Sequence, residues 1–479
     1  TELPWHLQRT RVQHVWTGLN ITGTGVTVAV MDTGAEWLHP ALSESYRGMM
    51  DAETPQHEIA WFDAVDGATE PFDPHGHGTH VIGTAAGRGG IGVAPGSTWM
   101  AVRILGADGS GSLGDVHAGF QWLLAPNGDP TLTPDIVNGS WSAPPEFDQF
   151  IPDIEALHAA GIITVFAAGN TGPEKGTVRA PANYPGVVAV AATDDSDEVA
   201  WFSSRGPSHR TGQPKPTIAA PGMRILSALP GESYGFLNGT SMAAPHVAGL
   251  YALLLSAGSD INPTLATAIL TATAQISDGS PPNDNLGWGR ADAYAALSSA
   301  TLTGRVSGEV TSGGVPLPGT AITITLAGES GLAFETESDG SFVVDLISGT
   351  HALAATAFGH EQYVNSSVVV ATGAETHLAI DLSRLPFGTA IGRLLDLNTG
   401  QPLSGTVRVT GAPIKATVGD DGRYTLELPQ GEYELVASAM GHRLGRAEAT
   451  ITAVARFDQD FELEPGPRIL LVDSGRWYG

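Results

Sequence analysis

"TSMAAPHVAGLYALLLSAG", residues 240–258, is the most strongly helical stretch of the sequence. It opens with Thr and Ser, has an Ala- and Leu-rich interior and closes on Gly258, which predicts a long helix. Around it, short apolar runs closed by Gly or Asn predict strands over residues 25–34, 99–105, 134–141 and 161–170, and residues 151–160 predict a further helix. Such alternation predicts an α/β fold, with a mostly parallel sheet covered by helices on both faces.

In sheets of this kind, functional side chains gather at the carboxyl ends of the strands. Asp32, Asn138 and Asn170 all lie where a predicted strand ends. These three side chains are therefore the first candidates for a site.

Composition limits the classes of protein. The 479 residues include 61 Gly, 32 Pro and no Cys, and 42% are hydrophobic, which is typical of a globular protein of two to four domains. With 50 acidic residues against 23 basic ones, the formal net charge of -27 argues against nucleic acid or an anionic membrane as a partner. Without cysteine there are neither disulfides nor thiolate metal sites. No apolar run reaches the roughly 18 residues that span a bilayer.

The sequence pattern changes near residue 300. The helical pattern ends there, and short runs of alternating apolar and polar residues follow, separated by Gly, Asp and Pro. Residues 339–360 align without gaps to residues 421–442. The repeat, its strand lengths and its turn spacing predict two tandem β-sandwich domains. We therefore predict an α/β domain, two all-β sandwiches and the start of a truncated or processed segment, over residues 1–300, 301–385, 386–465 and 466–479.

"HGHGTH", residues 75–80, admits two interpretations. It matches the H-x-H-x-D-H zinc pattern of binuclear hydrolases, except that Thr79 replaces the Asp and no second cluster of histidines supplies further ligands. The alternative is that His77 alone serves as a proton carrier. Three other histidines of these motifs are expected to be structural: His75, His80 and His246.

A serine nucleophile needs a base, a carboxylate that orients the base, and donors for the oxyanion. The chain supplies candidates for these in order: Asp32, His77, Asn170 and Ser241. Because the first N–H groups of a helix are free and its dipole favours negative charge, the Ser241 amide is a candidate oxyanion donor. Taken singly, Asp32 and Asn170 are also typical turn residues, and Ser241 or Thr240 a typical helix N-cap.

The segments "VAVMDTG", "HGTHVIGT", "AAGN", "FSSRGP", "AAPG" and "GTSMAAPHVAG", in this order, resemble those of subtilisin-like serine proteases. "QWLLAP", "PDIVNGSWS", "PANYP" and "NDNLGWGRADAYAAL" are most similar to bacillopeptidase F-type enzymes. The resemblance implies a serine endopeptidase that acts through an acyl-enzyme. Asp32 would orient the base, His77 would be the general base and acid, and Ser241 the nucleophile. Asn170 and the Ser241 amide would form the oxyanion hole.

The same resemblance assigns the substrate-binding residues. Ser140, Trp141 and Ser142 would pair with the substrate backbone. Ala168 and Gly169 would line the pocket for the side chain that precedes the scissile bond. Relatives often have Gly where this chain has Ser142, so we expect a narrower mouth to that pocket.

The family further implies secretion, protein and peptide substrates and an inhibitory propeptide, and we expect a monomer without zinc, nucleic acid or membrane partners. The start, "TELPWHLQRT", lacks the apolar core of a signal peptide, so we expect any leader to be missing. Calcium is common in relatives, and "DAETPQHE" (51–58) and "DDSDE" (194–198) carry enough oxygen ligands for it. Neither has EF-hand spacing, and a solvated acidic loop is the alternative for both.

The two C-terminal repeats resemble carboxypeptidase regulatory-like domains, which are transthyretin-like sandwiches. Two functions other than proteolysis remain open. In the first, the chain is a binding or adhesive protein whose sandwiches carry the function and whose protease domain is inert. In the second, it is a zinc hydrolase that uses "HGHGTH".

Overall fold

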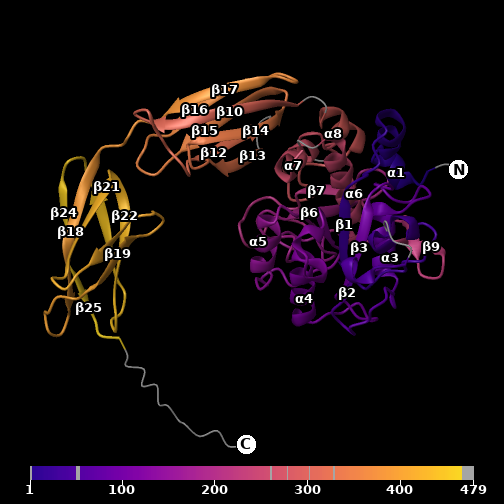
Figure 1. The fold of residues 1–479 in the computed structure, drawn as a ribbon, viewed down its shortest axis with the longest axis horizontal. Coiled ribbons are helices and arrows are strands. Elements are labelled where there is room, and N and C mark those ends of the chain that lie inside the picture. Colours follow the sequence, from indigo (N-terminus) through magenta and orange to yellow (C-terminus); the bar gives the residue numbers. More distant parts are fainter. Residues whose placement is uncertain are drawn as a thin grey trace, which may run out of the picture.

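Seven parallel strands form the central sheet of the N-terminal part (Figure 1). The computed structural model describes residues 3–49, 54–258, 261–277, 279–300, 303–326 and 330–466. The strands lie in the order β2-β3-β1-β4-β5-β6-β7, and every neighbouring pair is parallel. Their bounds are β1 Thr27–Asp32, β2 Trp61–Asp63, β3 Thr98–Arg103, β4 Ile136–Gly139, β5 Ile163–Ala167, β6 Val188–Thr193 and β7 Ile218–Pro221.

The four predicted strands are confirmed as β1, β3, β4 and β5. Every residue of β4, β5 and β6 is buried, because helices cover both faces of the sheet. This explains why these strands appear in the sequence as continuous apolar runs rather than as alternating ones.

The helix predicted over 240–258 is confirmed as α6 (Thr240–Ala257), followed by Gly258. It packs against β4 to β7 and against α3 (His77–Ala86) on one face of the sheet. The predicted helix over 151–160 is α5 (Ile151–Ala159), which packs with α4 (Leu113–Leu124) on the other face (Figure 1). The predicted α/β class, with helices on both faces, is therefore confirmed.

Shorter elements complete this part of the chain. The remaining α-helices are α1 Trp5–Arg9, α2 Val12–His14, α7 Pro263–Ala272 and α8 Ala293–Ala300. The short π and 3-10 turns are Val15–Leu19, Ser43–Ser45, Arg47–Met49, His57–Ile59, Pro126–Gly128 and Pro130–Leu132. A hairpin of β8 (Ile225–Leu229) and β9 (Ser233–Leu237) lies beside α3. No helix in the described ranges is long and apolar enough to cross a membrane.

Two pairs of β-sheets follow α8 (Figure 1). The first pair comprises β10 Thr303–Ser312, β11 Val315–Pro316, β12 Ala321–Leu326, β13 Ser330–Glu335, β14 Ser341–Ile347, β15 Gly349–Thr356, β16 Tyr363–Val370 and β17 Glu375–Asp381. The second comprises β18 Phe387–Asp396, β19 Gly405–Val409, β20 Lys415–Val418, β21 Arg423–Pro429, β22 Gly431–Ala439, β23 Gly445–Ile451, β24 Arg456–Asp458 and β25 Phe461–Leu463. Val306 of β10 and Ile322 of β12 belong to one apolar cluster, so the two sheets of the first pair share a core.

The sequence repeat matches the positions of the strands in the two pairs of sheets. β14 and β21 occupy equivalent places in the two aligned repeats, and so do β15 and β22. β16 and β23 continue the correspondence just beyond the aligned residues. All-β architecture after the α/β part is thus confirmed. The domain boundaries and the likeness to carboxypeptidase regulatory-like domains stay predictions, and residues 467–479, nearly all of the final predicted segment, lie outside the described residues.

Candidate active site

Three elements bring the predicted catalytic side chains to one cavity. Asp32 is the last residue of β1, His77 the first of α3, and Ser241 the second of α6. His77, Asn170 and Ser241 line the same cavity, which has a volume of about 630 Å³. The predicted catalytic residues are therefore far apart in the chain but close together in the fold.

Asp32 and His77 form a pair in which the carboxylate is buried and the ring is partly exposed. His77 Nδ1 lies 2.7 Å from Asp32 Oδ1, and Asp32 is only 1% exposed. Burial lowers the pKa of His77, but the charge and hydrogen bond of Asp32, with a contribution from Asp73, outweigh this effect and raise the pKa above 6.5. Nδ1–H of the neutral ring donates a hydrogen bond to the carboxylate. The lone pair of Nε2 is therefore free to accept a proton.

Asp73 holds the start of α3 and was missed by the sequence prediction. Its Oδ1 accepts the backbone N–H of Gly76 at 2.8 Å, and its Oδ2 accepts the backbone N–H of Thr79 at 2.8 Å and its hydroxyl at 2.6 Å. The Thr33 hydroxyl donates to Asp73 at 2.8 Å and accepts the N–H of Gly78 at 2.9 Å. An acidic residue shortly before a helix is a recognisable signal that could have identified this contact.

Glycines at this helix start permit a close backbone approach. Gly76 has a φ of 91°, in the left-handed region that favours glycine. A Cβ built on Gly78 would lie 2.2 Å from the carbonyl oxygen of Gly34, so no larger residue fits there without moving the backbone. These contacts aim His77 at Asp32.

Ser241 is not the N-cap of its helix. The N-cap is Gly239, and the structure shows no side-chain cap bond, which makes the alternative interpretation of Ser241 or Thr240 as a cap wrong. The Ser241 hydroxyl donates to the Ser140 carbonyl at 2.9 Å, and the Ser140 hydroxyl donates to the Ser241 carbonyl at 2.7 Å. These two hydrogen bonds hold the start of α6 against the segment that follows β4.

The side-chain amide of Asn170 has a fixed orientation. Its Oδ1 accepts the backbone N–H and the hydroxyl of Thr240, each at 2.9 Å. The Thr240 hydroxyl also accepts the Gly169 N–H at 3.2 Å. With Oδ1 engaged, the Asn170 Nδ2 group supplies the N–H donors on the side of the cavity.

We expect Asn170→Ala to lower kcat about 10²- to 10³-fold with a small change in KM, a size taken from the same kind of donor in subtilisin. The expectation assumes the predicted role of Asn170 as an oxyanion donor, which would stabilise charge that develops only in the transition state. Steady-state kinetics on a chromogenic peptide measures the effect, with Thr240→Ser as a control that keeps the hydroxyl bonded to Asn170. An unchanged kcat in Asn170→Ala would contradict this role.

The predicted substrate-binding residues lie on two neighbouring chain segments. Ser140, Trp141 and Ser142 follow β4, and Ala168 and Gly169 follow the adjacent β5. Ser142 is exposed, whereas Ala168 is fully buried. Ser140, Trp141 and Ser142 line the same cavity as His77 and Ser241, and the pocket predicted between the two segments stays a prediction.

Arg179 joins these two segments and was not predicted. Its backbone N–H donates to the Ala168 carbonyl at 3.0 Å, and its Nε donates to the Ser142 hydroxyl at 3.0 Å. The sequence carries no pattern that places residue 179 beside both segments, because this contact depends on how the loop after β5 folds back.

The three histidines of "HGHGTH" have separate surroundings. His77 pairs with Asp32, His75 is exposed, and the buried His80 ring donates towards the carbonyl oxygens of Ile225 and Gly235, at 3.0 and 3.2 Å. Across the described ranges, no three His, Asp or Glu side chains are grouped as metal ligands. The geometry of the three rings thus supports the proton-carrier interpretation over a shared zinc site.

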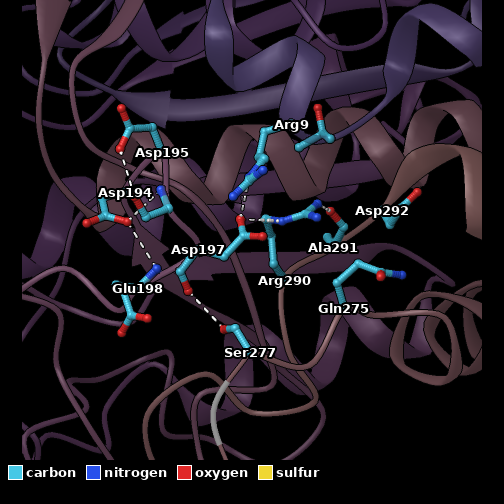
Figure 2. A network of polar contacts seen from close by, with 12 residues as sticks. Arg9, Asp194, Asp195, Asp197, Glu198, Gln275, Ser277, Arg290, Ala291 and Asp292 are labelled. Carbon is cyan, nitrogen blue, oxygen red and sulfur yellow. Dashed lines mark hydrogen bonds and ion pairs between the residues drawn. The ribbon is translucent and has the colours of Figure 1, made fainter.

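Figure 2 shows the acidic run at 194–198 considered above for calcium. Asp197 pairs with Arg9 at 3.0 Å and with Arg290 at 2.6 Å. Asp194 instead accepts the backbone N–H groups of Ser196 and Glu198, at 2.9 and 3.0 Å. The carboxylates of Asp194 and Asp197 thus face different partners, and calcium binding stays a prediction.

Buried histidines behind the site predict acid sensitivity. Burial lowers the pKa of both His80 and His246 to about 4, well below their usual value. The unfolded chain therefore binds more protons between pH 6.5 and 4, so the free energy of unfolding falls as pH falls through this window, by up to about 3 kcal/mol per histidine. Urea unfolding at several pH values, in a Ser241→Ala background that prevents self-digestion, measures this effect.

A variant comparison isolates this contribution from that of the carboxylates. We expect His246→Gln to flatten the pH dependence between pH 6.5 and 4, whereas His209→Gln, at an exposed position, leaves it unchanged. Equal slopes in the parent chain and His246→Gln would show that burial of His246 does not govern the acid response.

Fold and site together are those of a subtilisin-like serine protease. The chain belongs to the Subtilase family, whose model matches residues 23–289. It is 40% identical over 332 residues to Bacillopeptidase F of Bacillus subtilis (strain 168), covering 64% of this chain and 23% of that protein. It is 35% identical over 280 residues to Serine protease AprX of the same strain, covering 51% of this chain and 60% of that protein. It is also 37% identical over 242 residues to Subtilisin of Bacillus pumilus, covering 49% and 78%.

Proposed function

We propose that this protein is a secreted serine endopeptidase that hydrolyses peptide bonds in proteins through an acyl-enzyme on Ser241. The observation that carries the proposal is the 2.7 Å contact between the buried Asp32 carboxylate and His77, whose ring lines the same cavity as Ser241. The family and its relatives named as serine proteases support the same activity.

In acylation, the Ser241 hydroxyl turns from the Ser140 carbonyl to His77. His77 Nε2 takes its proton while Oγ attacks the substrate carbonyl, and Asp32 stabilises the imidazolium through Nδ1. The developing oxyanion receives N–H groups from Asn170 and from the backbone of Ser241. His77 then gives the proton to the leaving amine, which releases the C-terminal product.

Deacylation repeats these roles with water. His77 removes a proton from the water, the hydroxyl oxygen attacks the acyl carbonyl, and the proton returns to Ser241 Oγ as the carboxylic acid leaves. The proposal includes an inhibitory propeptide in the precursor and a monomeric mature enzyme. Structural calcium is part of it as a further prediction.

A fluorophosphonate reagent tests the proposal, because it reacts only with an activated serine. We expect one adduct per chain on the tryptic peptide that contains Ser241, and none in Ser241→Ala. Ser256→Ala, on the same helix with its hydroxyl bonded to the Leu253 carbonyl, is the matched control and should be labelled normally.

The two other functions give different outcomes. An inert protease domain would leave the folded parent chain unlabelled and without peptidase activity. A zinc hydrolase would likewise stay unlabelled, but its activity would be lost on chelation and restored by zinc. Either outcome would overturn the proposal.

A further inference from the structure

Arg179 bridges the segments after β4 and β5, on which the residues predicted to bind substrate lie. A Cβ built on Gly169 would lie 2.8 Å from Arg179 Cδ and 2.9 Å from Cγ, so the aliphatic stem runs directly over Gly169. Nε then reaches the Ser142 hydroxyl at 3.0 Å on the opposite segment. The guanidinium therefore lies between Gly169 and Ser142, two residues predicted to bind the substrate beside the scissile bond.

The charge of Arg179 is not neutralised within the described part of the chain. No described carboxylate lies within ion-pair distance of it, in contrast to Arg103 and Arg290, which pair with Asp63 and Asp197 at 2.9 and 2.6 Å. Arg179 is also half-buried, so its charge is only partly hydrated. A planar guanidinium in this state binds a carboxylate well, because its N–H groups match the two oxygens.

Ser142 prepares this cation for a ligand. Its hydroxyl accepts the Nε hydrogen, which fixes the guanidinium plane and leaves the Nη1 and Nη2 groups without a hydrogen-bond partner among the described residues. Sequence comparison alone suggested that Ser142 narrows the mouth of the pocket. The structure gives Ser142 a second role, that of holding Arg179 in place.

We propose that Arg179 makes the peptidase selective for substrates with Asp or Glu immediately before the scissile bond. The inference rests on the proposed function, since it assumes cleavage at Ser241. The substrate carboxylate supplies the counter-charge that Arg179 lacks, and the pocket between Ser142 and Gly169 holds the acidic side chain.

Chromogenic peptides of the form succinyl-Ala-Ala-Pro-X-p-nitroanilide test the inference, with X being Glu, Gln, Ala or Phe. The Glu and Gln substrates have nearly equal volumes and differ in charge. We expect kcat/KM to be about 10- to 100-fold higher for Glu than for Gln, the size of a hydrogen bond to a charged group. The ratio should decrease at high salt, because ions screen the attraction.

Variants separate charge from shape. Arg179→Gln should bring the Glu-to-Gln ratio to about 1, and Arg179→Lys should give an intermediate ratio, since it keeps the charge without the planar fork. Arg210→Gln is the matched control. That guanidinium stacks over Tyr184 and donates to the Phe147 carbonyl at 2.8 Å, so its loss should leave the ratio unchanged.

Active-site titration with the fluorophosphonate counts the folded, competent enzyme in each preparation. A ratio near 1 in the labelled parent enzyme would overturn the inference and leave the proposed function intact. An Arg179→Gln variant that gains activity on the Phe substrate without losing its preference for Glu would also overturn the inference. In that case Arg179 would limit the size of the substrate side chain and would not bind its charge. Absence of labelling would instead overturn the proposed function.

Discussion

Replacement of His77 by Ala is expected to lower kcat by about 10⁶-fold, the loss known for removal of the base in subtilisin. In the proposed mechanism, the substitution removes the base that accepts the Ser241 proton during attack and the acid that returns it to the leaving amine. The residual rate comes from the oxyanion donors and from substrate binding. Kinetics on a chromogenic peptide, with the concentration of folded protein measured independently, gives the size of the loss.

The chain contains a matched control for this substitution. His117 Nδ1 lies 2.8 Å from Asp153, so these two residues form a second histidine–carboxylate pair that resembles the first in geometry. His117 is on α4 and does not line the cavity of Ser241. We expect His117→Ala to retain kcat within a few-fold, and similar losses in both variants would indicate damage to the fold rather than to the chemistry.

Asp32→Asn is expected to lower kcat by about 10⁴-fold with little change in the fold, in line with the loss of this carboxylate in other serine proteases. An amide that donates to Nδ1 forces the proton onto Nε2, the atom that must accept from Ser241. The Thr33 N–H donates to the same Asp32 Oδ1 at 2.8 Å, so this one hydrogen bond loses its oxygen acceptor when the amide nitrogen faces Nδ1. Steady-state kinetics and thermal unfolding together distinguish lost chemistry from lost stability.

The pH profile gives an independent check on Asp32. The enzyme needs neutral His77, and Asp32 raises the pKa of that ring, so the parent loses activity as pH falls through a value above 6.5. Removal of the carboxylate charge should move this acid limb to lower pH. Asp153→Asn is the control that should change neither kcat nor the limb, and an unshifted limb in Asp32→Asn would contradict the assigned pairing.

Much of the site was predictable because its residues occupy places dictated by local sequence. Asp32 ends a buried strand, and His77 and Ser241 begin helices, positions that short motifs mark clearly. Strands such as β1 and β5 were found because each belongs to a mainly apolar run that closes on Gly or Asn. The three-residue strand β2 and the Ala-rich strand β6 were not identified individually.

Of the two residues that were missed, only Arg179 depends on a contact between distant segments. Asp73 accepts N–H groups from the turn and helix that follow it, a local pattern that the sequence does carry. Arg179 reaches Ser142 across 37 positions of sequence, and no periodicity or motif encodes that contact. Long-range side-chain contacts of this kind determine pocket chemistry, whereas local patterns determine only the elements that carry it.

The C-terminal sheets show the opposite case, in which repetition compensates for weak motifs. Alignment of the chain with itself predicted the two sandwiches, and the bounds of β14 and β21 agree residue for residue with that alignment. By contrast, β17 is one strand where the second unit has two, β24 and β25. A repeat therefore predicts equivalent strands but not the breaks that distinguish the two copies.

Trapping of the covalent intermediate tests the central claim most directly. The parent enzyme is mixed with an activated ester, quenched in acid within the first turnover, digested and analysed by mass spectrometry. We predict a stoichiometric acyl group on Ser241 that forms with the initial burst of product and is absent in Ser241→Ala. A burst without an acyl group on Ser241, or with the group on another residue, would contradict the account.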